Sequence, residues 1–289
     1  MAESGLIIVD KPGEWTSHDV VARMRRLAGT RRVGHAGTLD PMATGVLVVG
    51  VEKATRLLGH LTLTEKVYEA TIRLGVTTNT DDAEGEVTAT APASGVAAEE
   101  IRKGVEALTG AIMQIPPQVS AIKVNGQRAY KMARAGEEVE LAARPVTVRA
   151  FDVLDVRAHD DVVDVDAVVT CSSGTYIRSL ARDLGAALGV GGHLTRLRRT
   201  RVGPYDLSLA RTIDQLAERC VILPIGEAVA AAFPRRDVTA EEARVIGHGG
   251  RLAAAGLGEG PIGVFGPDGT LLALMEEQGR TARPLAVFV

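Results

Sequence analysis

The stretch from Arg31 to Gly45 holds the carboxylate whose surroundings best suit chemistry. It reads Arg-Arg-Val-Gly-His-Ala-Gly-Thr-Leu-Asp-Pro-Met-Ala-Thr-Gly. A backbone this rich in small residues turns tightly and lets a large ligand come close. Asp40 could then attack a substrate or take a proton from it. An aspartate directly before a proline is also a common turn former, so both interpretations stay open at this point.

Arg178 is a cation that lies next to a predicted helix start. It follows Ser172-Ser173-Gly174-Thr175, a run that we expect to cap a helix. On its own, an arginine in the first turn of a helix is a surface residue beside a cap. The helix should bury an apolar stripe that leaves the arginine one step to the side, made of Ile177, Leu180, Ala181, Leu184 and Leu188.

The sequence lacks the motifs of several other chemistries. It has no Gly-x-x-x-x-Gly-Lys phosphate loop and no His-Glu-x-x-His zinc helix. Gly258 to Gly263 matches a dinucleotide pattern by its letters but leads into a predicted hairpin instead of a helix. The acidic turn Asn79 to Glu84 lacks the glycine and glutamate of a calcium loop. Cys171 and Cys220 form no Cys-x-x-Cys pair. We therefore expect no metal and no cofactor.

The predicted elements indicate an α+β fold built on a mainly antiparallel sheet, because strands and helices do not alternate regularly. Tyr68 falls on the face of its strand that meets other structure. Ser17 is the expected N-cap of the first helix, which Gly29 ends. The predicted strands are Leu6–Val9, Val46–Val51, Lys66–Leu74, Val146–Val153 and Val162–Cys171, the predicted helices are Ser17–Ala28, Ala98–Leu108, Gln127–Ala135 and Ile177–Leu188, and Gly34–Gly45 is a predicted loop.

The character of the chain changes near residues 231–236. Beyond this point we expect a short helix at Ala240–Ile246, a glycine-rich stretch, and three strands. The turn Gly266-Pro267-Asp268-Gly269 predicts a hairpin between two of them. We therefore divide the chain into a main domain, 1–230, and a small β-barrel-like domain, 231–289. The strands are predicted at Ile262–Phe265, Thr270–Met275 and Leu285–Val289.

Charge and hydropathy limit the partners. The formal net charge is -3, but the arginines cluster around residues 23–32 and 196–201, so one face could be positive enough to hold phosphates. A solvated surface is the usual alternative for such clusters. No apolar window approaches the length that crosses a bilayer, and the N-terminus has no signal-peptide pattern, so we expect a cytoplasmic protein.

Gly34-His35-Ala36-Gly37-Thr38-Leu39-Asp40-Pro41 closely resembles the Gly-His-x-Gly-x-Leu-Asp-Pro signature of the TruB family of tRNA pseudouridine synthases. Further segments are similar to family segments in the family's order, from about Gly5 to Glu227. Asn79 departs from the acidic residue expected there. The tail resembles, more loosely, a PUA-like RNA-binding domain. The matching segments begin with Lys11-Pro12, Trp15 to His18, Lys66 to Ala70 and Thr78 to Asp82, and they end with Gln114 to Pro117, Cys171 to Arg178 and Gly192 to Thr200.

The resemblance implies a fold of the pseudouridine synthase type and an isomerase that acts on a uridine in the T arm of tRNA, at position 55. The base is cut from its sugar, turned and rejoined through carbon, without a cofactor. Asp40 would be the catalytic carboxylate and Arg178 the cation that keeps it charged. Tyr68 would stack on the flipped base and could take the final proton. Whether Asp40 acts on the base or on the sugar stays open.

The resemblance also implies the residues that bind the RNA. His35 would fill the space left by the flipped base, and Leu197 would form an apolar wall of the pocket. Lys11, Asp82 and Tyr176 would complete the substrate site. We expect a monomer without an obligate protein partner. The predicted phosphate contacts are Arg31, Arg32, Arg196, Arg198 and Arg199.

Three alternatives remain at this level. An RNA-binding protein without activity would explain the basic clusters and the β tail equally well. Asp40, Tyr68 and Arg178 together disfavour it, because a pure binder needs no ionised buried carboxylate. A synthase for another RNA, such as ribosomal RNA, is disfavoured by the resemblance to the tRNA branch. A metal- or nucleotide-dependent enzyme lacks any motif of its own.

Overall fold

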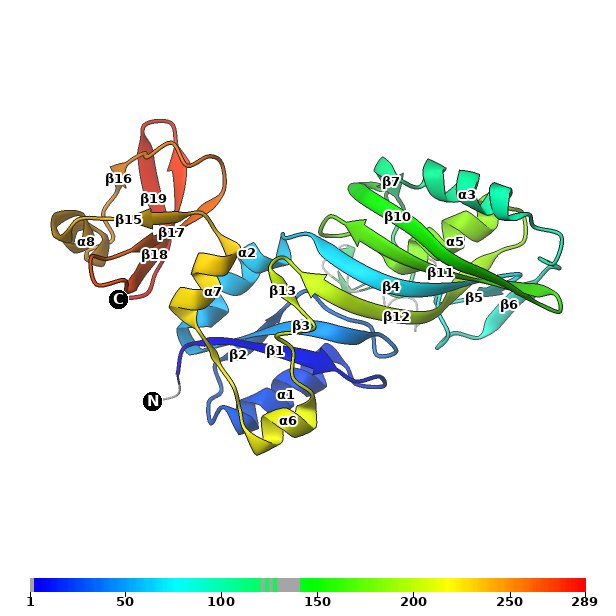
Figure 1. The fold of residues 1–289 in the computed structure, drawn as a ribbon, viewed down its shortest axis with the longest axis horizontal. Coiled ribbons are helices and arrows are strands. Elements are labelled where there is room, and N and C mark those ends of the chain that lie inside the picture. The colour runs from blue at the N-terminus through cyan, green and yellow to red at the C-terminus, as the bar shows by residue number, and fades with distance from the viewer. Residues whose placement is uncertain (1–2, 121–122, 125–126, 129–140) are drawn as a thin grey trace. The chain divides into compact units, whose positions relative to one another are not determined.

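The computed structural model describes residues 3–120, 123–124, 127–128 and 141–289 (Figure 1). The chain forms two compact units. Unit 1 comprises Met1–Asp40, Gly45–Thr64 and Val202–Val289, and unit 2 comprises Pro41–Thr44 and Glu65–Arg201. The strand pairs are mainly antiparallel, which confirms the predicted α+β class.

Unit 1 begins with a sheet in which the first strand pairs antiparallel from Gly5 opposite Val51 to Lys11 opposite Gly45. One strand of this sheet, Val33–Ala36, overlaps the first residues of the predicted loop at 34–45, so that part of the prediction is wrong. Its ends, Val33 and Ala36, are buried, which explains why the chain extends there. The strands are β1 (Gly5–Lys11), β2 (Val33–Ala36), β3 (Thr44–Val51) and β14 (Leu223–Pro224).

The N-cap of the first helix, α1 (Ser17–Leu27), lies one residue earlier than predicted. Thr16 is the N-cap, and its side chain and that of Asp19 form a capping box. The helix buries Val20, Val21 and Met24, as its periodicity predicts, and Gly29 follows its end with a φ of 64°. The other short elements of this part are η1 (Glu52–Leu57), α2 (Leu58–Thr62), β13 (Tyr205–Asp206), α6 (Ile213–Glu218) and α7 (Ile225–Ala232).

The tail forms a second sheet in unit 1, in the order β15-β17-β18-β19-β16. The predicted turn at 266–269 joins two of its strands, and Gly266 accepts and donates backbone hydrogen bonds there, so the hairpin is confirmed. The predicted helix at 240–246 is also present. The elements are β15 (Arg235–Asp237), α8 (Ala240–Gly247), β16 (Leu252–Ala253), β17 (Pro261–Phe265), β18 (Leu271–Gln278) and β19 (Thr281–Val287).

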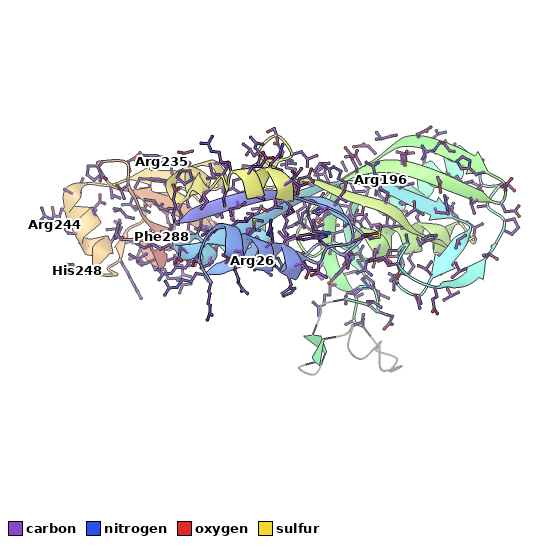
Figure 2. All side chains as sticks on the ribbon, turned by 90° about the horizontal axis from the view of Figure 1, so that it is seen from below. Arg26, Arg196, Arg235, Arg244, His248 and Phe288 are labelled. Atoms are coloured by element: carbon purple, nitrogen blue, oxygen red, sulfur yellow. The ribbon has the colours of Figure 1, made fainter. Side chains whose placement is uncertain are left out.

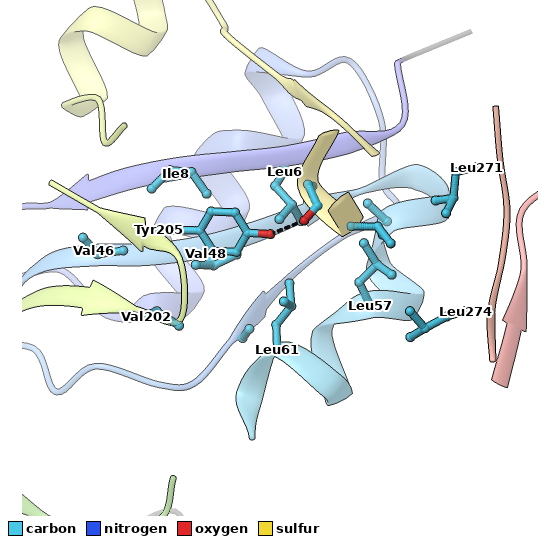
Figure 3. Packing of buried hydrophobic residues seen from close by; sticks show 14 of the residues in the cluster. Leu6, Ile8, Val46, Val48, Leu57, Leu61, Val202, Tyr205, Leu271 and Leu274 are labelled. Atoms are coloured by element: carbon cyan, nitrogen blue, oxygen red, sulfur yellow. Dashed lines mark hydrogen bonds between the residues drawn. The ribbon is translucent and has the colours of Figure 1, made fainter. Parts of the chain in front are cut away.

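The tail contributes to two hydrophobic cores. One is its own and includes Val238, Ile246 and Met275. The other joins tail side chains to buried residues of β1, β3, η1, α2 and α7, and we call it the shared core (Figure 3). Within it Tyr205 donates a hydrogen bond to the Ala228 carbonyl at 2.8 Å. The tail thus belongs to the compact unit of the N-terminal strands, and the predicted boundary at 230 stays a prediction. The shared core contains Leu6, Ile8, Leu57, Leu61, Phe265, Leu271, Leu274 and Phe288.

Unit 2 carries a sheet whose strands follow the order β12-β4-β11-β10-β7. Two of its strands, β4 and β11, have the predicted bounds, and α3 and α5 pack on each other and against this sheet. The predicted helix at 127–135 falls mainly outside the described residues, and its first two residues form β9. The elements are β4 (Lys66–Leu74), β5 (Val76–Thr78), β6 (Val87–Thr90), α3 (Ala98–Ala107), β7 (Gly110–Gln114), β8 (Lys123–Val124), β9 (Gln127–Arg128), β10 (Arg144–His159), β11 (Val162–Cys171), α5 (Ile177–Ala187) and β12 (Gly192–Val202).

Candidate active site

The backbone before Asp40 is fastened to the start of α1. The Ser17 hydroxyl accepts a hydrogen bond from the Leu39 amide at 2.9 Å and donates one to the Leu39 carbonyl at 3.2 Å. Both side chains are buried, and Gly37 makes the turn with a φ of 78°. Since only glycine adopts this φ at little cost, Gly37 allows the chain to leave β2 and to bring Leu39 to its two hydrogen bonds with Ser17. The half-buried Asp40 therefore follows a firmly held residue.

Lys11 and His35 also belong to unit 1. Lys11 is fully buried at the end of β1, and its ammonium donates to the carbonyls of Pro12 and Trp15 at 2.8 and 2.6 Å. These two hydrogen bonds to the backbone order the loop that leads into α1. His35 lies on β2, and its ring meets that of His18 edge to face at 5.7 Å between centroids. The roles of Lys11 and His35 toward a substrate stay predictions.

Arg178 is buried and not at the surface, which corrects the interpretation that its position in the helix suggested by itself. Its guanidinium donates to the Thr80 carbonyl at 2.8 Å and to the Val119 carbonyl at 3.0 Å. It also forms an ion pair with Asp82 at 3.4 Å, and both side chains are about 5 % exposed or less. A buried charge of this kind must be paired, and the acidic turn provides the partner.

The acidic turn holds Asp82 through its own residues. The Asp82 carboxylate accepts hydrogen bonds from the Thr80 hydroxyl at 2.5 Å and from the Glu84 amide at 3.1 Å. The turn is joined to β12 because the Leu194 amide donates to the Asp81 carbonyl at 3.1 Å. The acidic turn, which the sequence did not connect with Arg178, therefore places a buried carboxylate against it.

Gln114 fixes the start of α5, and it was not among the predicted site residues. Its amide accepts from the Tyr176 N–H at 2.8 Å and donates to the Tyr176 carbonyl at 3.0 Å. The predicted cap at 172–175 is wrong, because Tyr176 is the N-cap and has no side-chain cap. Gln114, at the end of β7, replaces that cap from another element. Its place two residues before Pro116-Pro117, in a segment that resembles one of the TruB family, was the available signal.

Tyr68 and Leu197 are both buried side chains of the unit 2 sheet. Tyr68 lies on β4 opposite Val169, and 7 % of it is exposed, which confirms its predicted inward orientation. Leu197 lies on β12 with 6 % exposed. Lys66 is also buried, and burial, followed by the charge of Arg199, lowers its pKa to about 8.

The arginines of 196–201 do not share one exposed face, which corrects the prediction for this cluster. Side chains alternate along a strand, so Arg199 is buried with Leu197. Arg196, on the other side, is exposed (Figure 2). Arg196 pairs with Glu69 at 3.4 Å, and Arg198 donates to the Thr44 hydroxyl at 3.3 Å. A surface contact to phosphate is therefore open to Arg196 and Arg198 but not to Arg199.

The second basic cluster, around α1, is exposed. Arg31 and Arg32 lie at the surface of unit 1, and Arg32 forms a long ion pair, 3.9 Å from Glu52. Arg26 is exposed on the same helix end (Figure 2). Within the part of the chain that the structure describes, no group of three or more His, Cys, Asp or Glu residues could hold a metal, and no helix could cross a membrane.

Comparison with known proteins assigns nearly the whole chain to one kind of protein. Residues 25–177 match the family "TruB family pseudouridylate synthase (N terminal domain)", 178–229 match "tRNA pseudouridylate synthase B C-terminal domain", and 233–289 match "tRNA Pseudouridine synthase II, C terminal". A protein of Thermobifida fusca named tRNA pseudouridine synthase B is 65% identical, over 98% of each chain. One of the same name from Streptomyces griseus is 61% identical, over 98% of this chain and 97% of that protein.

Solved structures share the fold over nearly the whole chain. A chain from a Cbf5-Nop10-Gar1 complex is similar with a TM-score of 0.74 and 29% identity, over 99% of this chain and 85% of that one. A chain from an H/ACA RNP bound to a substrate RNA containing 2'-deoxyuridine is similar with a TM-score of 0.73 and 27% identity, over the same shares of the two chains.

Proposed function

Because the chain belongs to the TruB family of pseudouridine synthases, isomerases that act on tRNA, we propose that it converts a uridine of the T arm, at position 55, to pseudouridine with Asp40 as the reacting carboxylate. The observation that carries the proposal is the buried Arg178 with its carboxylate partner, because a paired buried cation has a use in stabilising charge during a reaction. The reaction is a redox-neutral isomerisation, and it therefore calls for no electron carrier. We propose that it also uses no nucleoside triphosphate.

Base flipping brings the uridine to the reactive groups. Extruding a nucleotide from a folded arm costs about a few kcal/mol, which stacking and pocket contacts offset. Tyr68 supplies the stacking face, His35 fills the vacated space, and Leu197 forms an apolar wall. In the reaction the bond between the uracil nitrogen and the sugar breaks, the base turns, and a bond from the ring carbon to the same sugar carbon forms. The proton on that ring carbon leaves, with Tyr68 as its acceptor, and the released ring nitrogen takes up a proton, so the product is an isomer of the substrate.

The charge of the reacting carboxylate depends on Arg178. Burial of a carboxyl group favours its neutral form, and an adjacent cation favours the ionised form. Arginine supplies this cation without losing its own charge, and its planar donors bind a carboxylate at two points, which lysine cannot do. Asp82 acts through Arg178, since it holds the guanidinium from the side of the acidic turn. Tyr176 and Lys11 complete the substrate site.

Asp40→Asn tests the catalytic assignment. An amide keeps the shape of the side chain and removes its charge, so turnover should fall by several orders of magnitude while tRNA binding persists. The assay incubates the protein with a tRNA transcript and maps pseudouridine by chemical labelling. Asp155→Asn, at an exposed strand position, is the matched control and should keep full activity. Turnover of Asp40→Asn near the wild-type rate would exclude Asp40 as the reacting group.

Phosphate binding is the proposed role of Arg31, Arg32, Arg196 and Arg198. Removing one arginine that binds a phosphate of helical nucleic acid should reduce the slope of log affinity against log salt by about 0.9. Replacing Arg31 and Arg32 with Ser should therefore flatten the slope and weaken binding. The control is Arg102→Ser, which removes an exposed arginine paired with Glu99 on α3. An unchanged slope would make the α1 cluster a solvated surface.

The remaining proposals concern the tail and the state of the protein. We assign tRNA binding to the PUA-like tail, and we propose that the protein works as a cytoplasmic monomer without an obligate partner. Light scattering on the purified chain measures its oligomeric state. Exhaustive chelation, with the tRNA folded in monovalent salt, should leave turnover intact. Rescue by one specific divalent ion, with tRNA structure unchanged, would contradict the cofactor-free mechanism.

A further inference from the structure

A second arginine lies one helical turn after Arg178 on α5. The Arg182 guanidinium lies 3.2 Å from the Asp81 carboxylate and donates to the Ile115 carbonyl at 2.8 Å and to Asp183 at 2.9 Å. The Asp81 side chain is 12 % exposed and that of Arg182 26 %. Residues four apart on a helix share a face, so two arginines at this spacing meet two consecutive aspartates of the acidic turn.

The backbone of the acidic turn makes this double pairing possible. In an extended chain two consecutive side chains point to opposite sides. Asp81 instead has a φ of 60°, in the left-handed region, where a residue with a Cβ is strained by about 1 kcal/mol or more. The conformation is held because the Asp81 carbonyl accepts from Leu194 and the Asp82 carbonyl accepts from Thr78. Both carboxylates therefore reach α5.

The charge of Arg182 determines whether Arg178 interacts with Asp82 alone or with Asp81 as well. Burial raises the pKa of Asp81, whereas Arg182 and then Arg178 act in the opposite direction. Arg178 is thus within electrostatic reach of Asp81 as well as of Asp82. Without the charge of Arg182, the buried Asp81 carboxylate would attract the Arg178 guanidinium. The guanidinium would then interact with Asp81 in addition to its present acceptors.

We propose that Arg182 is a positioning residue for the reaction: by neutralising Asp81 it keeps the Arg178 guanidinium paired with Asp82. This inference rests on the proposed function in that it takes Arg178 as part of the active site. The proposed role of Arg182 is electrostatic. The alternative is a mechanical role, in which Arg182 only holds the acidic turn against α5.

Four variants of the full-length protein separate charge from mechanics. Arg182→Gln keeps a donor for the Ile115 carbonyl and removes the charge, whereas Arg182→Lys keeps the charge. Asp81→Asn removes the carboxylate that Arg182 neutralises, and it is also combined with Arg182→Gln. The control is Arg102→Gln, which removes a charge from an exposed ion pair on α3. The kcat and KM for tRNA are measured for each.

Arg182→Gln should lower kcat by about tenfold or more, with KM for tRNA within about threefold of wild type. Arg182→Lys, Asp81→Asn and the double variant should each stay within about threefold of wild type, because none of them leaves Asp81 charged without a cation of its own. A double variant as slow as Arg182→Gln, or a tenfold loss in Asp81→Asn alone, would show a mechanical role and overturn the proposal. A wild-type kcat in Arg182→Gln would do the same.

An NMR measurement tests the effect of Arg182 on Arg178 without an activity assay. The Nε–Hε signal of Arg178, assigned by its loss in Arg178→Lys, should move in Arg182→Gln and return in the double variant. A signal that stays in place in Arg182→Gln would overturn the inference. Wild-type protein that makes no pseudouridine would instead refute the proposed function, and the NMR comparison would still report on Arg182.

Discussion

Leu274 and Met275 are neighbours on β18 whose side chains enter different cores. Leu274 is fully buried in the shared core with Leu57 and Phe288, whereas Met275, 1 % exposed, packs in the tail's own core. Truncating either to alanine removes buried carbon atoms and leaves a cavity, at a cost of about 2–5 kcal/mol. For a unit of this size, each kcal/mol lowers the unfolding midpoint by about 2–4 °C. We therefore expect each variant to lose about 4–20 °C.

Trp15 provides the probe that separates the two parts of unit 1. It is the single tryptophan of the chain and lies just before α1, in the N-terminal part of the sequence. Its fluorescence therefore follows unfolding of the N-terminal part, while circular dichroism follows both parts. If the tail and the N-terminal strands unfold together, both variants will lower the midpoint seen by Trp15. Met275→Ala is the decisive variant because its side chain faces away from the shared core.

If Met275→Ala lowers a circular dichroism transition and leaves the Trp15 transition unchanged, the tail unfolds by itself and the shared core is only a contact between two folding units. Leu63→Ala serves as the control, since Leu63 is 72% exposed and its truncation should cost less than about 0.5 kcal/mol.

Three further predictions concern buried groups of unit 2 and one thiol of unit 1. Burial raises the pKa of Cys171 to about 11 and also raises that of Cys220, but Cys171 is fully buried and Cys220 only half-buried. Iodoacetamide at pH 8 should therefore modify Cys220 in the folded protein and spare Cys171, as mass spectrometry will show. The pKa of Lys66 is about 8 in the folded protein and about 10.4 in the unfolded chain. Between these two pH values the unfolded chain binds more protons, so the free energy of unfolding should rise with pH by up to about 1.4 kcal/mol per pH unit. Urea titrations of Lys66→Met should lack this rise. Gln114→Leu leaves the Tyr176 amide without its acceptor and should cost about 1–3 kcal/mol in urea unfolding; a loss below about 0.5 kcal/mol, the size of an ordinary surface substitution, would contradict the capping role.

Local patterns could be predicted where burial alone sets the structure. The strands β4 and β11 came out with their predicted bounds because apolar and β-branched residues alternate along them. The stripe of α5 was predicted from the helical spacing of its apolar residues. The tail hairpin was predicted from the turn residues Gly266 to Gly269. The strand β2 was missed because its four residues, between Arg32 and Gly37, carry too short an apolar pattern to stand out.

The candidate site depended on pairings between distant segments, which no local pattern contains. Arg178 and Asp82 are far apart in the sequence, so neither the burial of the arginine nor its partner could be read from its own helix. Gln114 caps a helix whose N-cap lies sixty-two residues later. Arg199 was placed with its exposed neighbours because the strand β12, and with it the alternation of sides, was not predicted.

The way the two units divide the chain sets an order for folding during synthesis. Nearly all of unit 2 is one continuous stretch, Glu65–Arg201, whereas unit 1 needs both ends of the chain. On the ribosome, unit 2 has all its strands available while the N-terminal segment, whose strands β1, β2 and β3 pair with one another, still lacks β14 and the tail side chains of the shared core, since chains grow at about 5–20 residues per second. The last of these partners are at the very end: Lys53 and Arg56 of η1 donate to the carbonyls of Phe288 and Val287. A chain that stops a few residues early would therefore release a folded unit 2 attached to an unfinished unit 1, with its apolar strands exposed to chaperones and proteases.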